Sequence, residues 1–97
     1  MEFEGTYQTV SHFWKRFQHP GSMEIHISGS EITGTVHSPG IAAAIESGQL
    51  NGSHFSFCMR KGFLVMQVDG EFTPNGVVGT MRAPFGTSHF EGTKVNS

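Results

Sequence analysis

The sequence lacks most of the features on which secretion, membrane insertion or disulfide stabilisation depends. Its one cysteine, Cys58, cannot form an internal disulfide, so nothing indicates an oxidising compartment. The first residues, Met-Glu-Phe-Glu-Gly, have neither the positive segment nor the apolar run of a signal peptide. No apolar stretch approaches the ~20 residues that a membrane-spanning helix needs. We therefore expect a cytoplasmic protein with no membrane partner.

Charged residues are also scarce, at 14% of the 97 residues, and the formal net charge is −2. The six basic residues are scattered along the sequence: Lys15, Arg16, Arg60, Lys61, Arg82 and Lys94. Without a basic stripe, we expect no nucleic-acid partner. No Gly-rich phosphate loop and no Gly-x-Ser-x-Gly turn occurs, so the sequence predicts no cofactor.

Glycine and phenylalanine, by contrast, are abundant, with 13 and nine residues. Together with few strong helix formers, this composition is typical of a turn-rich all-β chain. Two stretches, Ile32–Pro39 and Val77–Pro84, are imperfect copies that align Gly34 with Gly79, and each reads as one strand that ends at a proline corner. A chain of this length has room for one domain, residues 1–97.

Alternating apolar residues predict about eight antiparallel strands with short connections. The segment 3–10 resembles the closing segment 90–95, and pairing of the first and last strands would remove both sheet edges. One short helix is expected over 41–47, where Ile-Ala-Ala-Ala-Ile-Glu-Ser precedes Gly48. The predicted fold is a small antiparallel meander β-barrel, with an open sandwich as the alternative.

Several of these signals together resemble a family of small, mostly uncharacterised bacterial domains with repeated Gly-Thr strands and Pro-x-Gly corners. The residues that carry the likeness are Gly34-Thr35, Pro39-Gly40, Asn51-Gly52, Phe55-Ser-Phe57, Gly79-Thr80, Pro84-Phe-Gly86 and Phe90-Glu-Gly-Thr93. This sequence departs from the family's charged turns, since it has Asn51-Gly52 and Pro74-Asn75-Gly76 instead. The resemblance implies a calycin-like (lipocalin-like) barrel and supplies no substrate.

The residues expected to face inward make an adaptable apolar lining: Met23, Ile25, Phe55, Phe57, Met59, Val65, Met81 and Phe90. Such a lining suits a small apolar ligand in the barrel mouth, although it equally suits a filled core. The predicted ligand-binding residues are the anchors Trp14, Phe55, Phe57, Met59 and Met81, with His54 and Arg82 as polar groups that orient the ligand.

Two histidine patterns leave an enzyme as an alternative. Ser-His-Phe occurs three times, and His12, His54 and His89 on neighbouring strands could together bind zinc. Glu24, His26 and His37 could form an acid–base group for a cyclase or isomerase reaction. Both patterns are also ordinary for the solvent-facing side of a sheet, and we expect neither a metal nor a catalytic site.

The segment that begins at Phe63 predicts a partner chain. Val65 is expected to face inward, so Leu64, Met66 and Val68 would make the opposite face of the same strand apolar. A strand that is apolar on both faces needs a second cover, and a homodimer would provide it. A structural or oligomerisation module without a ligand is therefore a third functional alternative.

Overall fold

The computed structural model describes residues 3–13, 17–38, 41–84 and 86–96, and within these ranges the chain forms strands and no helix. The strands are β1 (Gly5–Phe13), β2 (Phe17–Ser28), β3 (Glu31–Ser38), β4 (Ile41–Ala44), β5 (Glu46–Asn51), β6 (His54–Lys61), β7 (Leu64–Thr73), β8 (Gly76–Ala83) and β9 (Gly86–Asn96). The described residues therefore contain no helix long and apolar enough to cross a membrane.

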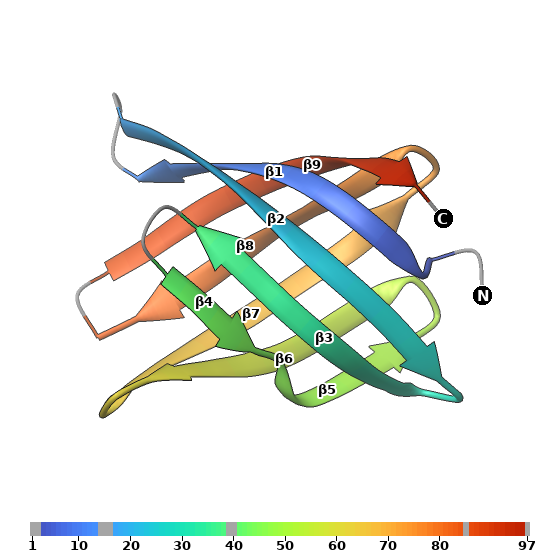
Figure 1. Ribbon diagram of the computed structural model, residues 1–97, viewed down its shortest axis with the longest axis horizontal. Coiled ribbons are helices and arrows are strands. Elements are labelled where there is room, and N and C mark those ends of the chain that lie inside the picture. Colours follow the sequence, from blue (N-terminus) through green and yellow to red (C-terminus); the bar gives the residue numbers. More distant parts are fainter. Residues whose placement is uncertain (1–2, 14–16, 39–40, 85, 97) are drawn as a thin grey trace.

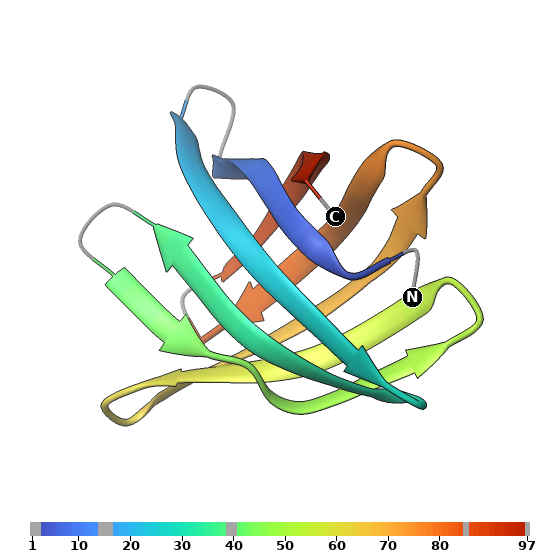
Figure 2. The ribbon, with the colours of Figure 1, turned by 45° about the vertical axis from the view of Figure 1, so that its right-hand side comes forward.

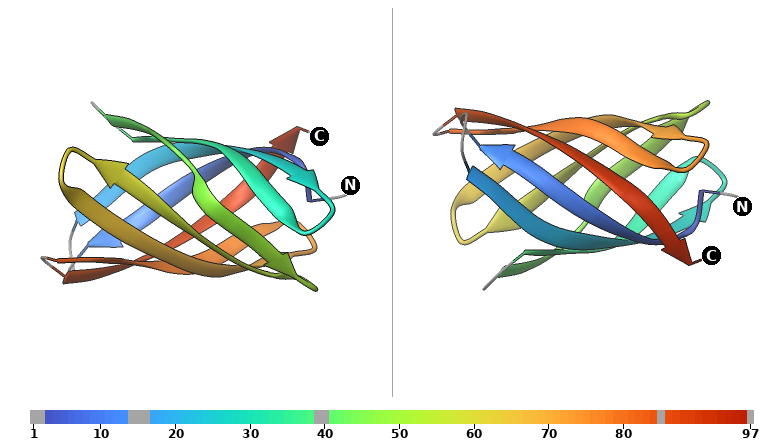
Figure 3. Two further views of the ribbon diagram at one scale, coloured as in Figure 1. Left: turned by 90° about the horizontal axis from the view of Figure 1, so that it is seen from below. Right: turned by 90° about the horizontal axis from the view of Figure 1, so that it is seen from above.

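The strands close into a barrel (Figure 1). Their order is β2-β1-β9-β8-β7-β6-β5-β3-β4, and a further pairing of β2 with β3 joins the sheet to itself. This gives a closed antiparallel barrel of eight strands, with β4 as an extra strand beside β3. The two views of Figure 3 show how strongly the strands tilt around it. The predicted meander barrel is confirmed, as is the pairing of the first and last strands, β1 and β9.

The barrel has two ends, which we name by what lies there. At the termini end, β1 begins, β9 finishes, and short turns join β2 to β3, β5 to β6 and β7 to β8 (Figures 1 and 3). At the Phe63 end, the chain connects β1 to β2, β3 to β4, β6 to β7 and β8 to β9. The antiparallel register fixes this assignment, because β1, β6 and β8 all run in the same direction.

The core follows the alternation of the sequence. In β2, Met23, Ile25 and Ile27 are buried and their neighbours are exposed; in β6, Phe55 and Phe57 are buried in the same way. Residues that pair across two strands lie on the same face of the sheet, so the inward residues of one strand determine which residues of its neighbour face inward. The buried apolar residues are Tyr7, Met23, Ile25, Ile27, Ile32, Ala43, Ile45, Phe55, Phe57, Met59, Val68, Phe72, Val77 and Phe90.

The helix predicted over 41–47 is wrong, because this segment forms β4 and the start of β5 (Figure 2). β4 pairs along β3 from Thr35↔Ala44 to Ser38↔Ile41, and burial of Ala43 and Ile45 follows a period of two. So short a segment gains little from the helix propensity of alanine, whereas pairing satisfies the edge of β3. Ser47, at φ 54°, lies within β5, where the pairing of β5 with β6 shifts register between Glu46 and Gln49.

The predicted orientation of the strand after Phe63 is also wrong. Gly62 and Phe63 form a two-residue turn, so Lys61 pairs with Leu64 and the inward Phe57 pairs with Val68. Val68 is therefore buried, and Val65 is 45% exposed. The outer face of β7 continues as Gln67, Asp69 and Glu71 and is mostly polar. The observation from which we expected a homodimer is thus reversed.

Candidate functional site

A cavity of about 480 Å³ lies at the termini end of the barrel. It is bounded by the segment before β1, the turn between β7 and β8, and the last part of β9. The lining residues are Phe3, Tyr7, Phe72, Thr73, Pro74, Gly76 and Lys94. The cavity thus has aromatic rings on its walls and one cationic side chain.

The aromatic wall continues into the barrel as a column of rings. Phe3 stacks on Phe72, with ring centroids 4.7 Å apart and planes 9° apart. Phe72 in turn contacts Phe55 at 4.7 Å, and Phe55 stacks on Phe57 at 5.8 Å. Tyr7 packs against Phe72 from the side, at 5.7 Å. Because these rings support one another, the inner wall of the cavity is held rigidly by the core.

Two hydrogen bonds hold the segment before β1 beside this cavity. We call Phe3, Glu4 and the contacts that hold them, to Tyr7, Ile27 and Phe72, the N-terminal latch. The Tyr7 hydroxyl donates to the Phe3 carbonyl oxygen at 2.7 Å. The Ile27 backbone N–H donates to Glu4 Oε1 at 2.8 Å. Tyr7 is 2% exposed, and burial raises the pKa of its hydroxyl, so the neutral donor form is favoured.

The predicted apolar anchors fall into separate places. Phe55 and Phe57 belong to the aromatic column behind the cavity. Met59 and Met81 lie nearer the Phe63 end, where Met59 is buried and Met81 packs partly buried against the core. Trp14 lies outside the described residues. Of the four anchors that the structure describes, the fold therefore brings Phe55 and Phe57 behind the cavity and leaves Met59 and Met81 nearer the other end.

The two polar groups predicted to orient a ligand point away from the barrel interior. His54 Nε2 lies 3.5 Å from Glu71 Oε1, and its side chain is 72% exposed. Arg82 donates to Asp69 Oδ2 at 2.9 Å and is also mostly exposed. His54, Asp69 and Glu71 border a groove of about 730 Å³ on the outer surface. Neither side chain lines the aromatic cavity.

The histidines are not gathered into a metal or acid–base site. His12 pairs directly with His89, but His54 is three strands away from His89 in the sheet order. Among the residues that the structure describes, no three His, Cys, Asp or Glu side chains lie close enough to hold a metal ion. The three-histidine zinc hypothesis is therefore wrong.

The acid–base hypothesis fails in the same part of the chain. His26 pairs with Thr33 and His37 with Ser22, so the two imidazoles lie well apart along β2 and β3. No hydrogen bond or ion pair connects either of them to Glu24 within the described part of the chain. The arrangement is that of an ordinary solvated sheet face.

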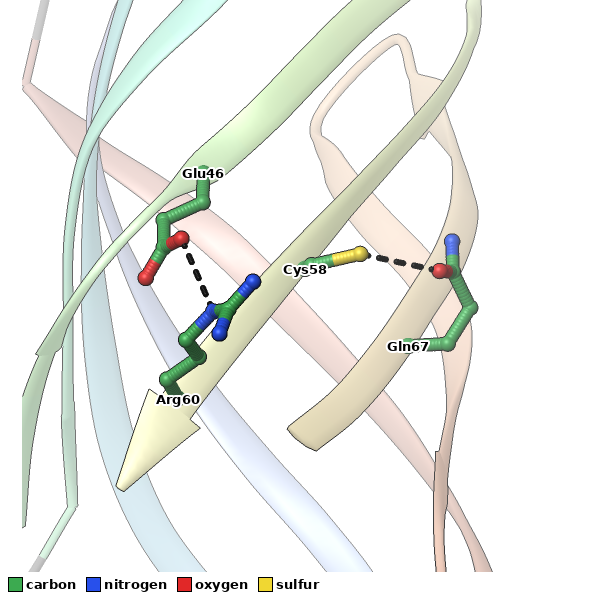
Figure 4. A network of polar contacts seen from close by, with 4 residues as sticks. All are labelled: Glu46, Cys58, Arg60 and Gln67. Atoms are coloured by element: carbon green, nitrogen blue, oxygen red, sulfur yellow. Dashed lines mark hydrogen bonds and ion pairs between the residues drawn. The ribbon is translucent and has the colours of Figure 1, made fainter. Parts of the chain in front are cut away.

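Cys58 also lies outside the barrel (Figure 4). Its thiol donates to Gln67 Oε1 at 3.1 Å, and Arg60 on the same face donates to Glu46 Oε1 at 3.1 Å. The hydrogen-bond partner of this thiol among the described residues is therefore an amide oxygen and not a histidine.

One polar group in the interior has no partner. Ser88 is 1% exposed, and its hydroxyl makes no hydrogen bond in the described structure. The Ser88 side chain faces the barrel interior from β9, and Ser88 pairs with Met81 of β8. A buried hydroxyl without a partner costs free energy, so Ser88 is a point of weakness in an otherwise apolar lining.

Sequence reasoning missed the cavity residues Phe3, Tyr7, Phe72 and Lys94. Phe3 and Tyr7 alternate with polar residues in the first segment, and that pattern could have placed them inward. The bulge between Thr6 and Tyr7 could not be read from the sequence, yet it shifts the β1–β9 register so that Tyr7 pairs with Lys94.

No protein-family model matches the sequence, and a search of curated proteins finds no match either. Solved structures do share the fold. Fatty-acid-binding protein 1 of Echinococcus granulosus has a TM-score of 0.62 and 11% identity over 98% of this chain and 99% of that chain. Apo lipid binding protein 8 of Caenorhabditis elegans has a TM-score of 0.63 and 11% identity over 96% and 95%. A mutant of the fluorescent protein UnaG has a TM-score of 0.61 and 9% identity over 99% and 98%. Identities this low establish the barrel fold and leave function to the site itself.

Proposed function

We propose that this protein binds a small apolar molecule in the cavity at the termini end, against the ring of Phe72. The observation that carries the proposal is the cavity of about 480 Å³ itself, which has three aromatic side chains on its walls. Small-molecule sites are typically concave, mostly apolar and a few hundred cubic ångströms in volume. The names of two structures that share the fold, a fatty-acid-binding and a lipid-binding protein, also favour an apolar ligand.

The lining suggests how such a ligand would lie. Its apolar body would rest on Phe72 and on the rings stacked behind it, where burial removes apolar surface from water. Lys94 supplies the cationic side chain of the lining, so an anionic group at the outer end of the ligand would be favoured. The ligand is therefore proposed to be amphipathic, with one anionic end.

The N-terminal latch controls access in this proposal. Phe3 covers part of the cavity and is held by its stack on Phe72 and by the hydroxyl of Tyr7. A ligand that displaced the Phe3 ring would take over its contact with Phe72. Movement of the latch, rather than opening of the sheet, would thus admit the ligand.

Two fluorescent probes that differ mainly in charge test the proposal. The neutral N-phenyl-1-naphthylamine and the anionic 1-anilinonaphthalene-8-sulfonate should each bind with one site per chain. The Thr73→Phe variant, which adds a ring to the lining, should weaken both. The Lys94→Met variant should weaken the anionic probe about tenfold and leave the neutral probe unchanged.

The matched controls are Arg82→Ala, which removes a cation from the outer surface, and His54→Ala, which removes an imidazole there. Both should leave the two affinities within twofold of the parent. Circular dichroism checks that each variant is folded. Failure of the parent protein to bind either probe at a defined stoichiometry would contradict the proposal, as would equal binding by Thr73→Phe.

The catalytic alternative has no observation in its favour, since no acid–base group is assembled among the described residues. The filled-core alternative accounts for the middle of the barrel but not for the cavity at the termini end. The homodimer and the cytoplasmic location stay predictions, and native mass spectrometry of the purified protein tests the first while revealing any retained ligand.

A further inference from the structure

The most exposed apolar side chain that the structure describes lies at the opposite end of the barrel. Phe63 is 94% exposed, in the two-residue turn between β6 and β7. Gly62, at φ 62°, makes this tight turn possible, and Phe63 projects beyond the last paired residues, Lys61 and Leu64. Val65, next to the turn, is 45% exposed. An aromatic ring so fully in water has no role in the packing of this chain.

The fold gathers at the same end basic residues that are scattered in the sequence. Arg60 and Lys61 are the last two residues of β6, and Arg82 is the second-last residue of β8. Both arginines are 63% exposed in their side chains, although each also pairs with a carboxylate further along the barrel. Lys61 is exposed and has no acidic partner among the described residues. Lys61 is therefore the basic side chain beside the Phe63 turn whose charge no carboxylate of the described residues offsets, and the two paired arginines lie further from the turn.

Acidic residues are absent from the sequence of the connections at this end, and the carboxylates of Glu46 and Asp69, which pair with the two arginines, come from further along the strands. No Asp or Glu occurs in the connections at residues 14–16, 39–40, 62–63 and 84–85, or in the two strand residues on either side of each. At the termini end, the turns at 29–30, 52–53 and 74–75 consist of Gly, Ser, Pro and Asn. Among the residues that the structure describes, the turns at the termini end thus carry no aromatic or basic side chain, whereas the turn at 62–63 carries Phe63.

We propose that the Phe63 end docks on the surface of an anionic lipid bilayer. Phe63 would enter the interfacial region, where aromatic side chains are favoured, and Lys61, Arg60 and Arg82 would face the acidic headgroups. The formal net charge of −2 opposes attraction of the whole molecule to such a surface, so binding depends on the local patch. This is docking by the tip of a hairpin, with no segment of the described residues that spans the membrane. It departs from the sequence-based expectation of no membrane partner, and it does not depend on the proposed ligand site.

Co-sedimentation with vesicles tests the proposal. The full chain should bind phosphatidylcholine vesicles that contain about a third phosphatidylserine, bind pure phosphatidylcholine far more weakly, and dissociate as salt is raised. Phe63→Ser should weaken binding to the anionic vesicles about tenfold, through loss of buried apolar surface. Lys61→Gln should weaken it about fivefold, as expected for one basic side chain near an anionic surface.

The matched controls make the same two kinds of change at the termini end, the loss of an exposed apolar side chain and a decrease of the net charge by one. Val95→Ser removes an apolar side chain that is 47% exposed, and Asn51→Asp lowers the net charge by one, as Lys61→Gln does, while keeping a turn-forming residue before Gly52. Both should bind within twofold of the parent. Absence of binding to anionic vesicles would overturn the proposal and favour an acidic protein partner for this surface. Equal binding by Phe63→Ser and Lys61→Gln would overturn it as well.

Discussion

Replacing Ser88 with alanine should make the protein more stable, which is the reverse of the usual effect of a mutation inside a protein. The Ser88 hydroxyl is buried, with the residue 1% exposed, and makes no hydrogen bond in the described structure. In the unfolded chain the same hydroxyl is solvated by water. Folding therefore removes its hydrogen bonds and returns none.

The expected gain follows from three contributions. Removal of an unsatisfied buried hydroxyl recovers about 1–3 kcal/mol. The void left by one oxygen atom costs about 0.5 kcal/mol, and the lower strand preference of alanine costs some tenths more. The net increase in the free energy of unfolding is about 1 kcal/mol, which corresponds to a rise in Tm of roughly 4–8 °C for a chain of this size.

Urea unfolding followed by circular dichroism measures this difference directly. The control is Ser56→Ala in β6, where the serine faces outward and is half-buried, so its free energy of unfolding should change by less than about 0.5 kcal/mol. A Ser88→Ala variant that is less stable than the parent would refute the reasoning. It would mean that an ordered water or a ligand satisfies the Ser88 hydroxyl in solution.

Two further predictions concern the latch and a glycine of the repeated strands. The pKa of the Tyr7 hydroxyl is raised by burial from 10.0, its value in the unfolded chain. The stability that the protonated hydroxyl contributes is therefore complete below pH 10.0 and is lost as the pH rises through the higher pKa of the folded state. At neutral pH the free energy of unfolding of Tyr7→Phe should be about 1 kcal/mol lower than that of the parent, because the Phe3 carbonyl loses its donor. Above about pH 10 the parent should lose stability more steeply than Tyr7→Phe. Urea unfolding from pH 8 to 11 measures both proteins, and parallel curves would contradict the assignment. Gly34→Ala should cost about 2–4 kcal/mol, since an added Cβ would lie 1.8 Å from the Glu24 carbonyl oxygen at φ 142°. Gly52→Ala, at φ 66° with open space around it, should cost about 1–2 kcal/mol in the same assay, and equal losses would contradict the steric argument.

The barrel could be predicted because its strands carry large apolar residues at every second position. Met23, Ile25 and Ile27 leave no doubt about which face is buried, and the same holds for Phe55 and Phe57. The alternation fails where both faces carry apolar side chains, as in residues 63–68. There the turn decides the orientation, and placing the turn one residue earlier would exchange the two faces. The segment 41–47 failed for a related reason, because small alanines indicate neither face and favour a helix locally.

The lining of the cavity could not be predicted, because its residues come from opposite ends of the chain. Phe55 and Phe57, which were placed inward from their own strand, lie behind the cavity without lining it. Tyr7 meets Lys94 only after the barrel has closed and the bulge has shifted the register. Phe72 joins them because β7 turns into β8 at the same end. Contacts between residues so far apart in the sequence produce no local pattern from which they could be predicted. The alternation of core residues can be predicted, because it repeats within each strand.

The proposed ligand cavity and the proposed lipid-docking surface lie at opposite ends of the same barrel. The cavity opens beside Phe3 and Lys94, where β9 ends, while Phe63 marks the far end of β6 and β7. A bilayer on the Phe63 end would leave the cavity facing water. The aromatic rings are packed from Phe72 to Phe57, and the latch that would move on ligand binding lies at the termini end, so we expect a bilayer on the Phe63 end to leave ligand binding unchanged. The affinity for a neutral probe should therefore be the same, within twofold, with and without saturating anionic vesicles. Coupling between the two would instead require that the termini end itself contact the lipid surface.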